Sequence, residues 1–360
     1  MGKEELLQLQ RRGILRRIAI IGKNMTYVNR YIHSVLPSSR PLLYPPNRYS
    51  KKDDLEAELR KNGLAISLHE TLKGGFFAQV YAATLDGKAV VVKHVGSITP
   101  FDPTEFYIPD SQFLTDVKVL RLLQHAKTIR VPGIIATLPK IRTVILEDMR
   151  QSDFVLMNDQ ILQKKLTLAS SQTIGTTLAL LAQESRKWKK FATNESAEQS
   201  MYERGFELRM LYPNSQTHYL SLEKEFVGND GYFCWPDGHP KNVFVDIKGN
   251  VSFIDFGRSH WSDQRYMLPN FLAHIVVYAL AGYVEKDLAK EYIREAVKAY
   301  QFIETIDEPL FCQYLAMEVL HRAAGKWVAG ITTKEQKLAL YDFGLTVFDE
   351  KRDKIDKLLS

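Results

Sequence analysis

Short runs of apolar residues at strand length follow one another between Ala65 and Met149. Their β-branched and aromatic content predicts strands, and the Asp-Gly of LDGK (85–88) predicts a tight hairpin turn. One longer stretch has apolar residues three and four apart, which predicts an amphipathic helix. The strands are AISLHETL (65–72), AQVYAATL (78–85), KAVVVKHV (88–95), VPGIIATL (131–138) and IRTVILEDM (141–149), and the helix is SQFLTDVKVLRLLQHA (111–126).

Beyond these strands the pattern becomes mostly helical. Helical spacing is found in residues 161–185, 194–211 and 269–360. A predicted hairpin interrupts it, with NVFVD (242–246) and VSFID (251–255) as its strands and KGN as the turn. Strands followed by helices predict an α+β fold.

The 360 residues are enough for two or three units of ordinary domain size. A change of pattern near residue 63 and another near residue 150 mark the expected boundaries. We expect a basic, proline-containing N-terminal extension (1–62), a β-rich lobe (63–149) and a helical lobe (150–360).

The chain carries a mild positive charge, +6 with a pI of about 9.0. Outside the first sixty residues the basic side chains are dispersed, and no motif alternates basic and aromatic residues, so we do not expect nucleic-acid binding. Two cysteines, Cys234 and Cys312, favour a reducing compartment. The start has no secretory pattern, and we expect a cytoplasmic protein. Residues 1–60 offer a membrane contact as an alternative to packing on the main body.

Polar residues flank the predicted hairpin within WPDGHPKNVFVDIKGNVSFIDFG (235–257). Asp237 and Asn242 come just before its first strand, and Asp255 ends its second. Because a tight hairpin brings its two ends together, we expect these three side chains to converge at one rim. Carboxylate and amide oxygens suit Mg²⁺ that is bound together with phosphates. A further carboxylate beside them can orient or deprotonate a hydroxyl.

The order D-x-x-x-x-N followed by I-D-F-G resembles the catalytic loop and the metal loop of the protein-kinase superfamily. With His-Pro inside the loop, the chain looks most like the aminoglycoside phosphotransferase-like branch of small-molecule kinases, over about residues 66–330. The resemblance implies a two-lobed kinase-like fold, ATP and Mg²⁺ as cofactors, and transfer of the γ-phosphoryl group to a hydroxyl. By position it implies Asp237 as the catalytic base, with Asn242 and Asp255 as the metal ligands.

The same resemblance assigns roles in the β-rich lobe. Gly74 and Gly75 would approach phosphates through their backbone N–H groups, in a turn that has Lys73 and Ala78 where the family often has glycine. Lys93, on the third strand, would pair with the α- and β-phosphates.

Lys93 needs an acidic partner on the following helix, and Asp116 stands where glutamate is usual. Glu105 is the other candidate. The strand TVILEDM resembles the one that leads to the hinge between the lobes. Its residues Glu147, Asp148 and Met149 would bind adenine through their backbone.

Three residues near the catalytic loop depart from the family pattern or have open roles. Trp235 replaces the usual histidine two positions before Asp237, and we expect it to brace the loop by packing. His239 fits loop bracing better than phosphate contact. Arg258 fits a phosphate, the acceptor or a salt bridge equally well.

The segment after Asp255 favours a small-molecule kinase over a protein kinase. RSHWSDQRYMLPNFLAHI (258–275) reaches a helix within about a dozen residues and contains no A-P-E anchor. The expected acceptor is a sugar, an amino alcohol or an aminoglycoside-like compound. Candidates for its pocket are Tyr202, Glu203, Arg204 and Arg209, with a solvated helix face as the alternative.

Two other functions stay open at this point. The basic N-terminal residues favour a lipopolysaccharide- or lipid-linked-sugar kinase at a membrane surface. The irregular glycine turn, Trp235 and the shortened acid Asp116 are also compatible with a pseudokinase that acts as a nucleotide-binding scaffold.

Overall fold

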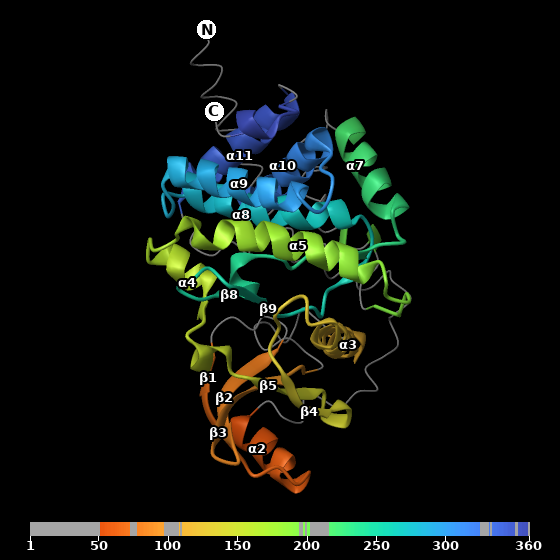
Figure 1. Cartoon of the computed structure of the whole chain (residues 1–360), viewed down its shortest axis with the longest axis vertical. Helices are drawn as coiled ribbons and strands as arrows, with labels where there is room; N and C mark the ends of the chain where they lie inside the picture. Colours follow the sequence, from red (N-terminus) through yellow and green to blue (C-terminus); the bar gives the residue numbers. More distant parts are fainter. Residues whose placement is uncertain are drawn as a thin grey trace.

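The computed structural model describes most of the chain from Lys51 onward. The described residues are 51–72, 78–96, 108, 110–193, 197–198, 200–201, 216–324, 331, 333–349 and 352–358. Figure 1 shows a β-rich lobe, coloured orange to yellow, below a larger helical lobe, coloured green to blue. This arrangement is the α+β, two-lobed architecture that the sequence predicts.

The β-rich lobe is built on a five-stranded antiparallel sheet with strand order β1-β2-β3-β5-β4. All five predicted strands are present. The β2–β3 turn is the predicted hairpin, and Asp86 and Gly87 both have positive φ, 49° and 76°, as a type I′ turn requires. The strands are β1 (Ile66–Thr71), β2 (Gln79–Leu85), β3 (Lys88–His94), β4 (Ile134–Leu138) and β5 (Thr143–Glu147).

A helix covers each face of this sheet. On one face, Leu55 and Leu59 of α2 (Lys52–Lys61) pack into a cluster with Val90 and Val92 of β3. On the other face, α3 (Asp110–Ala126) packs its apolar stripe into the main core. The helix α2 belongs to the stretch assigned to the N-terminal extension, and the proposed division at residue 62 stays a prediction.

Two small sheets, β6–β8–β9 and β7–β10, follow in the second half of the chain. Their strands are β6 (Val155–Leu156), β7 (Phe233–Cys234), β8 (Val243–Val245), β9 (Val251–Phe253) and β10 (His260–Trp261). The β8–β9 pair is the predicted hairpin. The Asp246 carboxylate fixes its turn by accepting the N–H groups of Lys248 at 2.8 Å and Asn250 at 2.9 Å.

Helices make up the second lobe, with α8 (Met267–Leu280) at its centre. This helix contains the apolar run FLAHIVVYAL (271–280), and nearly all its side chains are buried. Around it lie α4 (Met157–Leu162), α5 (Ser171–Ser185), α7 (Gln216–Gly228), α9 (Lys286–Gln301), α10 (Glu308–Ala324) and α11 (Lys334–Asp349).

Two helices that the sequence predicts in this lobe are not found as predicted among the described residues. The expectation of a continuous helix over 161–185 was wrong. The helix α4 ends at Leu162, and a short 3₁₀ turn (Leu168–Ser170) precedes α5. Lys164 in the break has a left-handed φ of 57°. The expected helix over 194–211 lies largely outside the described residues.

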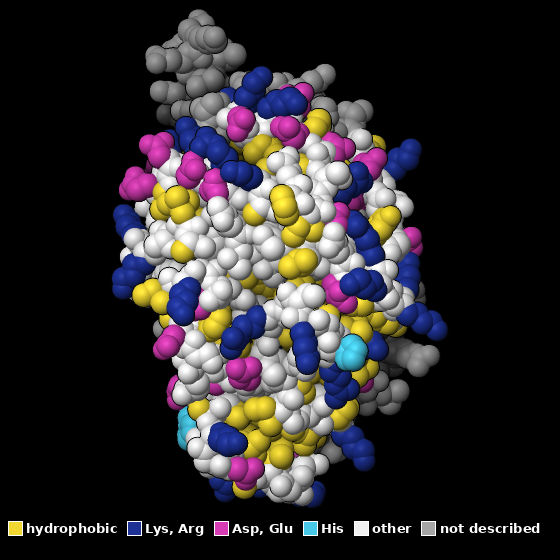
Figure 2. Space-filling view, in the orientation of Figure 1, with side chains coloured by type: hydrophobic (Ala, Val, Ile, Leu, Met, Phe, Trp, Pro, Cys, Tyr) yellow, Lys and Arg dark blue, Asp and Glu magenta, His cyan; other side chains and the backbone are white. Residues whose placement is uncertain are grey.

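On the face shown in Figure 2, apolar side chains gather in the lower part, over the β-rich lobe. Basic side chains are spread over this face among acidic ones and do not gather in one patch. Among the described residues, no helix combines the length and apolar content that crossing a bilayer would require.

Candidate active site

Lys93 connects the two lobes. It stands near the end of β3, and its Nζ lies 2.7 Å from Asp116 Oδ2 on α3 and 2.8 Å from Asp255 Oδ1 behind β9. The Lys93 residue is only 9% exposed. Lysines are rarely buried unless they are paired. The structure thus joins Lys93 to Asp116, the partner that the sequence suggested, and also to Asp255, for which the sequence suggested only a metal-binding role.

The charges of this triad depend on one another. Burial alone would lower the pKa of Lys93, but the carboxylates of Asp116 and Asp255 outweigh burial and raise it. Burial likewise opposes ionisation of Asp255, yet Lys93 holds the pKa of Asp255 below its ordinary value. The pKa of Asp116 is raised by burial, which Lys93 offsets only in part. Lys93 and Asp255 are therefore a charged pair at neutral pH.

Asp116 has a second contact that the sequence did not reveal. Its Oδ1 accepts the backbone N–H of Phe256 at 2.8 Å, while Oδ2 accepts from Lys93. One carboxylate on α3 therefore positions both the lysine and the backbone next to Asp255. The two distances are met by the short side chain of aspartate, in the place where glutamate is usual in the family.

Trp235 holds Asp255 through its backbone. Its indole Nε1 donates to the Asp255 carbonyl at 3.0 Å, and its ring lies 4.8 Å from that of Phe253 and 5.0 Å from that of Phe256. Asp255 has a left-handed φ of 63°, which costs a non-glycine residue energy. Trp235 therefore braces this residue by packing, as predicted, and also by a hydrogen bond that the sequence analysis missed.

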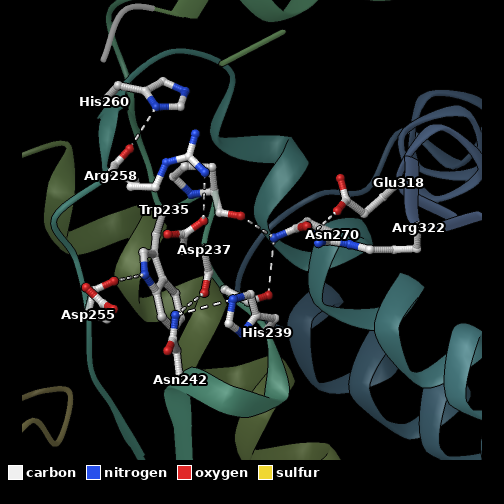
Figure 3. A network of polar contacts seen from close by, with 12 residues as sticks. Trp235, Asp237, His239, Asn242, Asp255, Arg258, His260, Asn270, Glu318 and Arg322 are labelled. Atoms are coloured by element: carbon white, nitrogen blue, oxygen red, sulfur yellow. Dashed lines mark hydrogen bonds and ion pairs between the residues drawn. The ribbon is translucent and has the colours of Figure 1, made fainter. Parts of the chain in front are cut away.

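The loop between Trp235 and Asn242 is fixed by hydrogen bonds from side-chain amides (Figure 3). Asn242 Nδ2 donates to the Asp237 carbonyl at 3.0 Å. Asn270 of α8 donates to the carbonyls of Pro236 at 2.9 Å and Gly238 at 3.2 Å. Sequence reasoning missed Asn270, although a buried asparagine in the apolar pattern of α8 was a signal, since buried polar groups need partners.

Asp237 and Arg258 face each other across this loop (Figure 3). The distance between Asp237 Oδ1 and Arg258 Nη1 is 3.9 Å, at the limit of an ion pair, and both side chains are mostly buried. Arg258 therefore has Asp237 as an ion-pair partner, and its expected contact with a phosphate or the acceptor stays a prediction. The carboxylate of Asp237 remains 17% exposed.

His239 lies on the inner side of the same loop. Its ring is 5.3 Å from that of His274 on α8, and its Nε2 is 3.5 Å from Asn242 Nδ2. Burial lowers the pKa of His239 to about 4, so the ring is neutral at pH 7. A neutral ring at the back of the loop supports the bracing role.

The residues assigned to Mg²⁺ fit that ion chemically. Asn242 Nδ2 donates to the Asp237 carbonyl, which leaves the Asn242 Oδ1 as a hard oxygen ligand for the ion. Asp255 is ionised and its side chain is 35% exposed. In the described part of the chain, no three His, Cys, Asp or Glu side chains cluster as a metal cage. Mg²⁺ that binds with nucleotide phosphates needs only one or two carboxylates.

The polar side chains of the predicted hinge form hydrogen bonds and an ion pair within the protein. Glu147 Oε2 accepts the Gly133 N–H at 3.1 Å, and Asp148 forms a two-pronged pair with Arg150, both distances being 2.8 Å. Met149 is buried. Adenine binding by the backbone of this segment stays a prediction.

The remaining predicted site residues lie outside the described residues: Lys73, Gly74, Gly75, Glu105, Tyr202, Glu203, Arg204 and Arg209.

Comparisons with known proteins bear on the fold. At the level of sequence, no family model and no curated protein matches the chain. Among solved structures, amicoumacin kinase hAmiN in complex with AMP-PNP, Ca²⁺ and amicoumacin is similar at a TM-score of 0.51 and 14% identity, over 86% of this chain and 99% of that one.

Two further structures lie in the same range. A putative aminoglycoside phosphotransferase from Ralstonia eutropha has a TM-score of 0.49 at 13% identity, over 82% of this chain and 98% of that one. The choline kinase LicA from Streptococcus pneumoniae has a TM-score of 0.47 at 12% identity, over 82% and 97%. The sheet, the helical lobe and the likeness to amicoumacin kinase agree with the resemblance read from the sequence. The chain has a two-lobed, kinase-like fold similar to that of amicoumacin kinase hAmiN.

Proposed function

We propose that the protein is an ATP-dependent phosphotransferase that moves the γ-phosphoryl group to a hydroxyl of a small molecule. One observation carries the proposal: Lys93 of one lobe is bound by Asp116 and by Asp255, beside the loop that presents Asp237 and Asn242. A buried amine paired with the ionised carboxylate of Asp255, at the junction of the lobes, suits binding of a metal–triphosphate complex.

Each side chain has a distinct task in this proposal. Lys93 binds the α- and β-phosphates, and Asp116 holds Lys93 in place. Asp237, partly exposed on its loop, orients the acceptor hydroxyl and takes its proton. Positioning and charge stabilisation supply most of the rate in such reactions.

Asn242 and Asp255 would hold Mg²⁺ through oxygen atoms. When bound, the ion would neutralise charge on the phosphates. In this proposal Trp235 positions a metal ligand. Its hydrogen bond to the Asp255 backbone carbonyl holds the residue that carries the metal-binding carboxylate.

A coupled assay of ADP release tests the proposal, with a panel of hydroxylated metabolites and aminoglycosides as acceptors. Asp237→Asn should retain nucleotide binding and lose transfer, whereas Asp255→Ala should lose Mg·ATP-dependent turnover. Asp287→Asn, an exposed carboxylate on α9, is the matched control. Undiminished transfer by Asp255→Ala would overturn the metal assignment.

The same measurements separate the alternative functions. A pseudokinase would be stabilised by ATP without Mg²⁺ dependence and would release no ADP with any acceptor. A kinase for lipid-linked sugars would sediment with liposomes, and the full chain should do so better than a chain without residues 1–50, which keeps α2.

A further inference from the structure

Tyr266 lies between a carboxylate of α10 and the amide that holds the catalytic loop. Its hydroxyl donates to Glu318 Oε2 at 2.6 Å and lies 3.2 Å from Asn270 Oδ1. Tyr266 directly precedes α8 and Asn270 lies in the first turn of that helix, four positions later, so the two side chains share one helix face. All three side chains are completely buried. A hydrogen-bonded path shielded from water therefore leads from α10 towards the loop.

Three consecutive backbone carbonyls of the catalytic loop accept hydrogen bonds from side-chain amides. They are the carbonyls of Pro236 and Gly238, which accept from Asn270, and the carbonyl of Asp237, which accepts from Asn242. Figure 3 shows Asn270 between the loop and Glu318. Because Asn242 is also a proposed metal ligand, the contacts of Asn270 are the ones that hold the backbone on both sides of Asp237 whether or not a metal is bound.

The Asn270 amide can hold the loop in only one orientation. The two ends of an asparagine amide have nearly the same shape, but the nitrogen donates and the oxygen accepts. A reversed amide would turn Oδ1 towards the carbonyl oxygens of Pro236 and Gly238, and both hydrogen bonds would be lost. A donor to Oδ1 on the other side prevents this reversal. The hydroxyl of Tyr266 is in the position of that donor.

The Tyr266 hydroxyl is in turn held by Glu318. The second oxygen of this carboxylate, Oε1, forms an ion pair with Arg322 one turn later on α10. Hydrogen bonds to such a charged acceptor are stronger than those between neutral groups. The Tyr266 ring packs edge-on against the rings of Phe226 at 5.2 Å and Tyr314 at 5.5 Å. Packing therefore places the ring, and the hydroxyl serves the two polar contacts.

We propose that the Tyr266 hydroxyl positions the proposed base Asp237 through the Asn270 amide, and that Tyr266 is thus a positioning residue for phosphoryl transfer. The inference rests on the proposed function. It gives Tyr266 no contact with a substrate. Loss of the hydroxyl should therefore affect the transfer step and leave nucleotide binding unchanged, because the proposed phosphate ligand Lys93 belongs to the other lobe.

A pair of matched variants tests the role of the hydroxyl. Tyr266→Phe keeps the packed ring and removes only the oxygen. Tyr292→Phe on α9 is the control, because Tyr292 is also completely buried and its hydroxyl also has a side-chain partner, Ser170 Oγ at 3.0 Å. Each variant loses a buried hydrogen bond, so their melting temperatures should fall by similar amounts.

The two variants should differ in turnover. For Tyr266→Phe, kcat per nucleotide-binding site, counted by titration with AMP-PNP, should fall about tenfold, while the KM for ATP changes by less than about twofold. For Tyr292→Phe, both values should stay within about twofold of wild type. Equal kcat values for the two variants would show that the Tyr266 hydroxyl serves stability alone and would overturn the inference.

A double-mutant cycle tests the route through Asn270. Asn270→Ala removes both loop contacts and should itself lower kcat. In that background, Tyr266→Phe should lower kcat by less than about twofold further, because the hydroxyl no longer has an amide to orient. A double variant in which the two separate losses multiply would place Tyr266 on another route and contradict the proposal.

Glu318→Gln separates the hydrogen bond of Glu318 from its charge. Either end of the glutamine amide can bond to the Tyr266 hydroxyl, whereas the ion pair with Arg322 is lost. The melting temperature should fall, and kcat per nucleotide-binding site should stay within about threefold of wild type. A loss of kcat as large as that of Tyr266→Phe would assign the effect to the buried charge in place of the hydroxyl.

Hydrogen exchange of the loop gives a readout that needs no acceptor. The Gly238 and Asn242 N–H groups donate within the loop, to the carbonyls of Trp235 at 3.3 Å and His239 at 2.8 Å. Both amides should exchange faster in Tyr266→Phe than in wild type or Tyr292→Phe. Unchanged exchange would overturn the positioning role. Faster exchange in a protein that phosphorylates no acceptor would leave the positioning of the loop standing and remove the kinase.

Discussion

The indole N–H of Trp235 donates to the backbone carbonyl of Asp255 at 3.0 Å and so connects the start of the catalytic loop to the residue proposed to bind the metal. The two residues are twenty positions apart in the sequence: Trp235 precedes the β8–β9 hairpin and Asp255 follows it. The bond holds Asp255 in a backbone conformation that aspartate adopts only with support.

Removing this bond while keeping an aromatic ring should weaken the metal site. Trp235→Phe leaves the Asp255 carbonyl without its donor, and we expect a loss of about 1 kcal/mol in unfolding free energy. Activity should require a higher Mg²⁺ concentration, because the Asp255 carboxylate is less well positioned. Mg²⁺ titrations of ADP release and urea unfolding measure the two effects. An unchanged Mg²⁺ dependence would show that packing alone positions Asp255.

Restoring the acid that is usual in the family should harm this protein. Asp116→Glu adds a methylene at a fully buried position where the carboxylate contacts both Lys93 and the Phe256 N–H. We expect kcat/KM for ATP to fall about tenfold, since a longer side chain cannot keep both distances. The control is Asp287→Glu, which adds the same methylene at an exposed position of α9. Activity equal to wild type would mean that the sheet and α3 adjust freely.

A buried histidine in the β-rich lobe should make folding sensitive to acid. His94 is 2% exposed, lies 3.0 Å from Thr143 Oγ1, and burial lowers its pKa to about 4. Above pH 6.5 the ring is neutral in both states and contributes nothing to pH dependence. As pH falls towards 4, the unfolded chain takes up the proton first, so stability decreases by about 2 kcal/mol at pH 5.

Urea unfolding at pH 7.5 and pH 5 checks this expectation, with His94→Gln as the variant. The variant should lose less stability than wild type between the two pH values. His239 and His274 act in the same direction in both proteins, so the difference reports on His94. His125→Gln, on the exposed part of α3, is the control. Equal losses in wild type and His94→Gln would contradict the assignment.

The close approach of α5 and α9 depends on a glycine. A Cβ on Gly175 would lie 2.0 Å from the backbone oxygen of Ala296, so Gly175→Ala must push the two helices apart. We expect a loss of about 2–3 kcal/mol in unfolding free energy. Gly228→Ala near the end of α7 meets nothing within 4 Å and should be neutral or slightly stabilising. Calorimetric melting of the two variants tests the contrast.

Hydrophobic periodicity and turn residues within short segments were enough to predict much of the fold. The Asp86-Gly87 turn and the spacing in α3 gave their elements directly, because a hairpin and an amphipathic helix each depend on neighbouring residues. The pattern failed at residues 163–167, where helical periodicity continues across a break that tertiary packing and the left-handed Lys164 impose.

In the candidate site, too, some residues could be predicted from a short motif and others could not. Residues in a short motif, such as Asp237 and Asn242, could be named because spacing along one hairpin fixes their neighbourhood. The Phe256 N–H contact of Asp116 spans 140 positions, and Asn270 reaches the loop from a helix that follows it. Such contacts depend on how elements pack, which periodicity does not encode.

The double contact of Asp116 has a consequence for movement. Asp116 and Lys93 belong to one lobe, whereas the Phe256 amide and the Asp255 carboxylate belong to the other. A rotation that separates the two lobes must therefore break the Lys93–Asp255 ion pair and the Asp116–Phe256 hydrogen bond at the same time. We expect the lobes to separate in one cooperative step, and the contacts that assemble the site to slow the escape of products.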